Sequence, residues 1–283
     1  HPVREYLNGL EWDKQNRLDT WLCDYMGAEQ SEYLKVVGAA WMVSAVARVF
    51  EPGCKADVTL VFEGEQGIRK SSAFQVLGGE WFTDSMPPLG TKDSLLQMPG
   101  CWIIEMAELE PVKKTSVLQM NAFLTCQEDR YRPPFEKFVV DVPRQCVFAG
   151  TTNHDDYLRD PTGSRRMWPV AVTKADIAQL TANRDQLWAE AVARYREGHK
   201  WWLEGDEQIA LAVTEQAARY EGDPWDELIQ PFIEQRETVT VSEILTDCIG
   251  IPPADFKQQD QNRIARALKS AGWKRQKVRV EAG

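Results

Sequence analysis

The sequence lacks the cysteine and histidine patterns that mark metal centres and disulfide-rich proteins. Its six cysteines are scattered without any Cys-x-x-Cys pair, and it has only three histidines. A zinc site is therefore not expected. A disulfide framework is not needed either, because a chain of 283 residues can bury enough apolar surface to fold without one. We expect an intracellular, reducing environment.

The chain also lacks long apolar runs, internal repeats and low-complexity segments. Its longest apolar stretch, residues 36–50, is shorter than a membrane span and is interrupted by Ser44 and Arg48. No signal peptide is recognisable. We therefore expect no association with a membrane.

Positive charge is scarce overall. Acidic residues outnumber basic ones, so that the formal net charge is -10 and the isoelectric point lies near 5.0. This balance argues against a surface that binds nucleic acid all over, but it leaves room for a local basic groove. One such region runs from Lys257 to Arg279, where Asp260 is the only acid among eight basic residues.

The most informative motif is an apolar strand that runs into a glycine-containing loop. Residues 58–63 fit a buried strand, and Ser72 begins a helical segment. In such an arrangement backbone N–H groups and the helix N-terminus face a phosphate, Lys70 adds a positive charge, and the Ser71 hydroxyl is placed to bind Mg²⁺. The nucleotide-binding candidates are Gly64, Glu65, Gln66, Gly67, Ile68, Arg69, Lys70, Ser71 and Ser72.

Arg69 departs from this motif, because glycine normally stands directly before the lysine. A side chain here replaces hydrogen where the backbone nears the phosphate, which leaves the affinity for ATP open. Arg69 could instead add a phosphate contact. The alternative interpretation of the whole segment is an ordinary strand-to-helix turn with a surface lysine.

Three further motifs follow in the order that a nucleotide hydrolase needs. Glu105 ends a second apolar strand, where an acid can hold the metal and orient water. Asn153 follows a third strand and can hydrogen-bond a γ-phosphate and the attacking water. Arg165 and Arg166 follow a Pro/Gly turn, and an arginine that reaches a neighbouring subunit's nucleotide would stabilise the transition state in a ring or filament. Taken singly, these residues also fit an acidic helix start, a turn asparagine and surface arginines.

Strands that alternate with helical segments predict an α/β fold, with a parallel sheet flanked by helices. We expect four parts: a helical N-terminal segment (1–56), a P-loop ATPase core (57–175), a helical lid or connector (176–224) and a small domain (225–283).

The small domain has the pattern of a winged helix, with two helices and then a basic strand over residues 272–280. Lys274 and Arg275 are its candidate DNA-binding residues. A solvated basic helix, or a winged helix that binds protein, fits the same residues.

The order of these motifs is similar to that of an AAA+ ATPase. More specifically, the chain resembles the virulence-associated protein E family of phage and mobile-element proteins, which is related to superfamily 3 helicases and often follows a primase–polymerase domain. The similar segments are spread over most of residues 1–200 and include Glu63–Gly67 with Lys70-Ser71, Trp81–Asp84, Glu105 with Glu108, Arg132–Phe135, Gly150–Asn153 and Arg165-Arg166 with Trp168–Val170.

The resemblance assigns a role to each candidate. It implies that Lys70 and Ser71 are Walker A residues and that Glu105 is the Walker B acid, with Ser71 and Glu105 holding Mg²⁺ beside ATP. Asn153 looks like the sensor 1 residue. The arginine finger would be Arg165 or Arg166.

The resemblance also implies a contact with DNA. Superfamily 3 helicases place a hairpin before the sensor strand, and its tip contacts single-stranded DNA in the ring lumen. The segment 131–141 stands in that place, with Phe135, Lys137 and Arg132 as the candidate DNA-binding residues. An ordinary hairpin with a solvated lysine is the alternative. Arg144 nearby could serve DNA, a neighbouring nucleotide, or neither.

We therefore expect a DNA-dependent ATPase, a 3′-to-5′ helicase motor that works with a primase in phage or mobile-element replication in the bacterial cytoplasm. It would bind ATP and Mg²⁺ between subunits of a homo-oligomeric ring, which we expect to be a hexamer. Since the sequence begins with His1, we expect a longer polypeptide with a further N-terminal domain. The alternatives are an ATP-regulated DNA-binding module that does not unwind, and a P-loop phosphotransferase.

Overall fold

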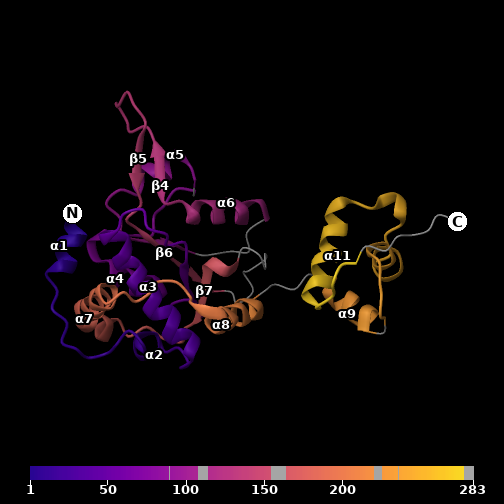
Figure 1. Ribbon diagram of the computed structural model, residues 1–283, viewed down its shortest axis with the longest axis horizontal. Coiled ribbons are helices and arrows are strands. Elements are labelled where there is room, and N and C mark those ends of the chain that lie inside the picture. The colour runs from indigo at the N-terminus through magenta and orange to yellow at the C-terminus, as the bar shows by residue number, and fades with distance from the viewer. Residues whose placement is uncertain (89, 108–113, 154–163, 220–224, 235, 277–283) are drawn as a thin grey trace. The chain divides into compact units, whose positions relative to one another are not determined.

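The computed structural model describes residues 1–88, 90–107, 114–153, 164–219, 225–234 and 236–276. The chain forms two compact units, His1–Tyr220 and Glu221–Gly283. The larger unit is a mixed α/β domain whose sheet is flanked by helices, and the smaller unit is helical where it is described (Figure 1).

Five parallel strands form the sheet of the larger unit, in the order β2-β3-β6-β1-β7. Their bounds are β1 (Thr59–Glu63), β2 (Phe82–Thr83), β3 (Ile103–Met106), β6 (Val147–Thr152) and β7 (Met167–Ala171). In the register, Leu60 of β1 lies opposite both Ala149 and Trp168. β1 is buried along its whole length, which explains why its sequence is nearly all apolar or β-branched. The predicted parallel sheet flanked by helices is confirmed.

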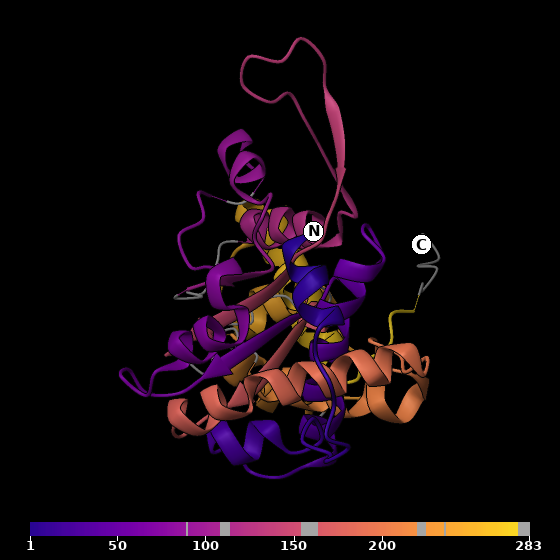
Figure 2. The same ribbon diagram turned by 90° about the vertical axis from the view of Figure 1, so that its left-hand side faces the viewer.

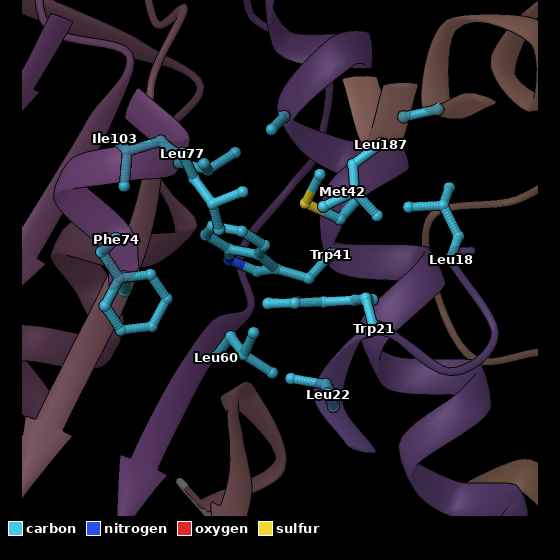
Figure 3. Packing of buried hydrophobic residues seen from close by; sticks show 14 of the residues in the cluster. Leu18, Trp21, Leu22, Trp41, Met42, Leu60, Phe74, Leu77, Ile103 and Leu187 are labelled. Carbon is cyan, nitrogen blue, oxygen red and sulfur yellow. The ribbon is translucent and has the colours of Figure 1, made fainter. Parts of the chain in front are cut away.

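The sheet separates two apolar cores, because successive residues of a strand point to opposite faces. Leu60 and Phe62 pack into the larger core (Figure 3), and Val61 between them packs into the smaller one. The larger core is covered by α1 (Pro2–Asn8), α2 (Trp21–Met26), α3 (Glu32–Phe50), α4 (Lys70–Gly78), α7 (Ile177–Arg196) and α8 (Gly205–Ala218); the smaller core is covered by α5 (Lys92–Gln97) and α6 (Lys114–Thr125).

Helix α3 passes through the larger core. By length and composition it could cross a membrane, but 78% of its apolar segment is buried inside the protein. The indole N–H of Trp41 (Figure 3) donates to the carbonyl of Phe148 on β6 at 2.9 Å, and that of Trp102 donates to the carbonyl of Ala45 on α3 at 2.9 Å. These two bonds attach α3 to the sheet and identify it as a core helix.

The short strand β2 was not expected from the sequence. It has two residues, and its pattern carries no strand signal of its own. Its conformation follows from pairing, since Phe82 lies opposite Ile103 of β3. A short 3₁₀ turn, η1 (Gly79–Trp81), leads from α4 into it.

The predicted hairpin is confirmed. Strands β4 (Glu128–Tyr131) and β5 (Val140–Pro143) pair antiparallel, with Tyr131 opposite Val140. The hairpin projects from the body of the larger unit, as both views show (Figures 1 and 2). Phe135 in its connecting loop has a φ of 66°.

The smaller unit contains α9 (Asp226–Glu234), α10 (Val241–Glu243), a π-helical turn η3 (Ile244–Cys248), a 3₁₀ turn η4 (Pro253–Asp255) and α11 (Gln258–Ser270). Ile229, Ile244 and Ile264 lie in its core. Residues 272–276 of the predicted basic strand form the end of a turn and irregular chain, and the remainder of that segment lies outside the described residues. The winged helix therefore stays a prediction.

Candidate functional site

The predicted phosphate-binding segment connects the carboxyl end of β1 to the first turn of α4. Ligands of open α/β sheets bind at this end of the strands. Residues 64–69, called here the β1–α4 loop, are exposed or half-buried, whereas Lys70 at the start of α4 is buried. Strand β6 lies beside β1, and β3 lies on the other side of β6, so that these two strands bring Asn153 and Glu105 to the same edge.

Lys70 is held by three hydrogen bonds. Its ammonium group donates to the carbonyl oxygens of Gly64 at 2.6 Å and Glu65 at 2.8 Å, and to Oδ1 of Asn153 at 2.9 Å. Burial lowers the pKa of Lys70, while the nearby carboxylate of Glu105 acts in the opposite direction. The lysine thus joins the β1–α4 loop to the end of β6, as the predicted order of motifs requires.

Glu105 lies beside the first turn of α4. One oxygen, Oε1, accepts hydrogen bonds from the hydroxyls of Ser71 and Thr151, each at 2.7 Å. The other, Oε2, has no hydrogen-bond partner among the described residues, although the side chain is only 1% exposed. Burial raises the pKa of Glu105; the two hydroxyls and Lys70 lower it, and Asp84 raises it.

Ser71 and Glu105 fit a magnesium site. A hydroxyl and a carboxylate are the oxygen ligands that Mg²⁺ prefers beside a phosphate group. The 2.7 Å hydrogen bond between them brings the two candidate ligand oxygens together. Oε2 of Glu105 is a buried oxygen that lacks a hydrogen-bond partner among the described residues. Thr151, which the sequence did not single out, orients Glu105 from β6.

The backbone of the β1–α4 loop is unusual at two positions. A Cβ atom on Gly64 (φ 152°) would lie 2.4 Å from the carbonyl oxygen of Val172, so only glycine fits there. Arg69 has a φ of 67°, in the left-handed region, and is the N-cap of α4. The backbone at Arg69 thus keeps the left-handed conformation that glycine adopts freely. For a residue with a Cβ atom, this conformation costs about 1 kcal/mol.

Glu63, the last residue of β1, fixes the start of the loop. Its carboxylate accepts two hydrogen bonds from Nε of Arg219, at 3.0 and 2.8 Å, and its backbone carbonyl accepts one from the N–H of Val172 at 2.8 Å. Both side chains of the ion pair are largely buried. No sequence motif pointed to this pair, because its members are 156 residues apart in the sequence.

The structure separates Arg165 and Arg166 from the β1–α4 loop. They lie in a 3₁₀ turn, η2 (Ser164–Arg166), directly before β7 and thus at the amino end of the sheet. A strand of this length spans roughly 15 Å, so neither arginine serves the loop of its own chain. Nε of Arg166 lies 3.3 Å from Oδ2 of Asp57, whereas Arg165 is exposed and has no ion pair within the described part of the chain.

The candidate DNA-binding residues are on the surface. Phe135, Lys137 and Arg132 are all exposed in the hairpin loop, and Phe138 beside them is 79% exposed. In the smaller unit, the basic residues Lys274 and Arg275 are likewise exposed. These side chains are therefore accessible to a binding partner.

Arg144 differs from the other hairpin candidates, because it is buried at the base of the hairpin. Its guanidinium donates to both carboxylate oxygens of Asp129, at 2.8 and 2.7 Å, and lies 4.2 Å from the centre of the Phe123 ring. Its role is structural, so of the interpretations left open it serves neither DNA nor a nucleotide.

Comparison with known proteins adds a family and a fold. Residues 7–221 match the family described as the virulence-associated protein E-like domain. Two apo structures of the NrS-1 C-terminal region are similar, with a TM-score of 0.52 each and 10% and 11% identity; each comparison covers 93% of this chain. This chain spans 65% of those structures, and at such identity the similarity shows the fold alone. No curated protein matches the sequence.

Proposed function

Since the chain belongs to the virulence-associated protein E-like family, we propose that it is an ATP-hydrolysing motor that acts on DNA. The observation that carries this proposal is the joint position of Lys70, Ser71, Glu105 and Asn153 at the carboxyl ends of three adjacent strands. A surface lysine in an ordinary turn would not be buried and bonded to a residue from another strand.

Each of these residues would have a separate role in phosphoryl transfer. Lys70 and the backbone N–H groups at the start of α4 would bind the β- and γ-phosphates. Ser71 and Glu105 would hold Mg²⁺, which when bound neutralises charge on the phosphate oxygens. The amide of Asn153, already bonded to Lys70, would orient the attacking water beside the γ-phosphate.

An arginine would complete the site from a neighbouring subunit. Arg165 is the better candidate, because it is exposed, whereas Arg166 is bound to Asp57 and would position its neighbour. A guanidinium near the γ-phosphate stabilises the charge of the transition state. This arrangement requires a homo-oligomer, for which we propose a hexameric ring.

The hairpin would contact single-stranded DNA. An aromatic ring stacks on a base and a cation binds backbone phosphate, and the hairpin loop offers Phe135 with Lys137 and Arg132. Lys274 and Arg275 would supply a second contact. ATP turnover would move the hairpin along one strand, as a 3′-to-5′ helicase of phage or mobile-element replication that works with a primase–polymerase.

The decisive experiment measures ATP hydrolysis with and without single-stranded DNA. We expect DNA to raise the rate. Hydrolysis without any response to DNA, together with phosphate transfer to a small molecule, would indicate a phosphotransferase instead. DNA stimulation without strand displacement would indicate a regulatory module.

A mixing experiment with two variants tests whether the arginine acts between subunits. Arg165→Ala and Lys70→Ala are each expected to abolish hydrolysis. Mixing the two variants should restore part of the rate, because a Lys70→Ala subunit still offers its Arg165 to the intact loop of its neighbour. If no mixing ratio restores hydrolysis, the arginine does not act between subunits.

A further inference from the structure

Strand β3 presents a single acid to the β1–α4 loop. Glu105 faces α4 through Ser71, whereas Met106, the next residue, packs with Ile104 in the smaller core on the opposite face. Among the described residues of β3, Glu105 is therefore the only carboxylate that can serve the site. Glu105 is proposed as a metal ligand, and the amide of Asn153 can orient the attacking water but cannot accept its proton, so a base for this water is still needed.

A second carboxylate stands on the neighbouring strand. β2 pairs in parallel with β3, with Phe82 opposite Ile103 and Thr83 opposite Ile104. Asp84 follows Thr83 directly, in a bend where β2 ends, and so lies at the same end of the sheet as Glu105.

Strand alternation gives the face on which Glu105 lies. Phe82 and Ile103 both pack into the larger core, and both lie next to Gly78 of α4. Since side chains two residues apart in a strand share a face, Glu105 lies on the same side of the sheet as Ile103, facing α4. The negative charge of Asp84 acts on the carboxylate of Glu105, which places the two acids near one another.

The two acids differ in their access to solvent. Glu105 is only 1% exposed and is bonded by two hydroxyls, whereas Asp84 is exposed. A buried carboxylate is suited to hold a metal. An exposed one at the rim can accept a proton and release it to solvent.

We propose that Asp84 is the second catalytic carboxylate of this site and that it activates the attacking water. This rests on the proposed ATPase function. Asp84 accepts a hydrogen bond from the water, whose oxygen forms a bond to the γ-phosphorus as the bond from that phosphorus to the bridging oxygen breaks. The bridging electron pair leaves with ADP, and the proton of the water passes to Asp84 and then to solvent.

The test compares Asp84→Asn with a matched surface change, Asp93→Asn, in the exposed first turn of α5. Loss of a general base lowers kcat about 100-fold or more, so we expect that loss for Asp84→Asn, with binding of a fluorescent ATP analogue within about twofold of wild type. Asp84→Glu should recover part of kcat, and Asp93→Asn should change neither quantity.

Two outcomes would overturn the assignment. One is a kcat for Asp84→Asn close to that of wild type. The other is a large loss in Glu108→Gln, a residue outside the described part of the chain, while Asp84→Asn stays active. If the wild-type protein binds the ATP analogue but Asp84→Asn hydrolyses normally, only this proposal fails; if wild type binds no nucleotide, the proposed function fails with it.

Discussion

The β1–α4 loop and the loop of the β4–β5 hairpin place a residue in the same rare backbone conformation, but they support it differently. Arg69 has a φ of 67° and Phe135 has a φ of 66°. Next to Arg69, the buried Lys70 is bonded to two carbonyls of its own loop. Phe135 instead lies with its side chain fully in solvent. The first loop is organised by the protein itself, whereas the second presents an aromatic ring that only a partner can cover.

This difference fits the two kinds of binding that we propose for these loops. Phosphate groups vary little in shape, so a site for them can be fixed in advance by internal hydrogen bonds. Single-stranded DNA is flexible, and stacking on an exposed ring tolerates any base. Substitutions in the two loops should therefore have separable effects on nucleotide and on DNA.

The largest effect is expected for Lys70→Ala. Removing a charge aimed at the transferred phosphate should lower ATP hydrolysis on the order of 100- to 1,000-fold. The measurement is the steady-state rate of phosphate release. Lys92→Ala, at an exposed lysine of α5, is the control and should leave the rate unchanged. A Lys70→Ala rate within twofold of wild type would contradict the assignment of the loop.

Phe135→Ala should affect DNA alone. Loss of one base-stacking contact is worth about 1–3 kcal/mol, which lowers the affinity for single-stranded DNA roughly 5- to 150-fold. Fluorescence anisotropy with a labelled oligonucleotide measures it. Val213→Ala on α8, at a position 55% exposed, is the matched apolar control. A fall in DNA-independent hydrolysis in Phe135→Ala would show that the two loops are not separable.

Glu105→Gln should reveal a pH-dependent effect on stability. Burial raises the pKa of Glu105 in the folded state, so its contribution to stability is present below the usual glutamate pKa and is lost as the pH rises through the folded value. Glutamine does not titrate. The stability of Glu105→Gln relative to wild type should therefore increase from pH 4.5 towards pH 8, as measured by urea unfolding without metal or nucleotide. A difference that stays constant over this range would contradict a raised pKa.

The smallest effect is expected for Arg69→Gly. Glycine relieves a left-handed side chain by about 1 kcal/mol, which should raise the Tm of a domain of this size by about 2–4 °C. Lys14→Gly is a suitable control, because Lys14 has a φ of 63° and lies outside the candidate site. Both variants should be stabilised when they are scanned by calorimetry. A lowered Tm in Arg69→Gly alone would mean that the arginine side chain stabilises the loop.

The sequence anticipated the elements whose signal is local. β1, β3, β6 and β7 are short apolar or β-branched runs, and their order along the chain predicted which polar residues follow strand ends. The hairpin at residues 131–141 was expected from the family resemblance, which places a hairpin before the third strand.

Features that depend on contacts between distant segments were not predictable. β2 exists through its pairing with β3, and Arg144 is buried because Asp129 and Phe123 surround its guanidinium. Likewise, the motif showed a missing glycine at Arg69, but only the structure shows that the backbone retains the left-handed conformation there.

The three hydrogen bonds of Lys70 have a consequence for how a phosphate enters the site. An ammonium group has three N–H donors, and here each has an acceptor within the protein. In the proposed function, a phosphate oxygen would therefore compete with Gly64, Glu65 and Asn153 for Lys70. Binding would be an exchange of partners, in which the side-chain amide of Asn153 or a loop carbonyl is released as the phosphate is bound. Lys70 would thus couple nucleotide binding to a change in the hydrogen bonds of Asn153 or of the β1–α4 loop.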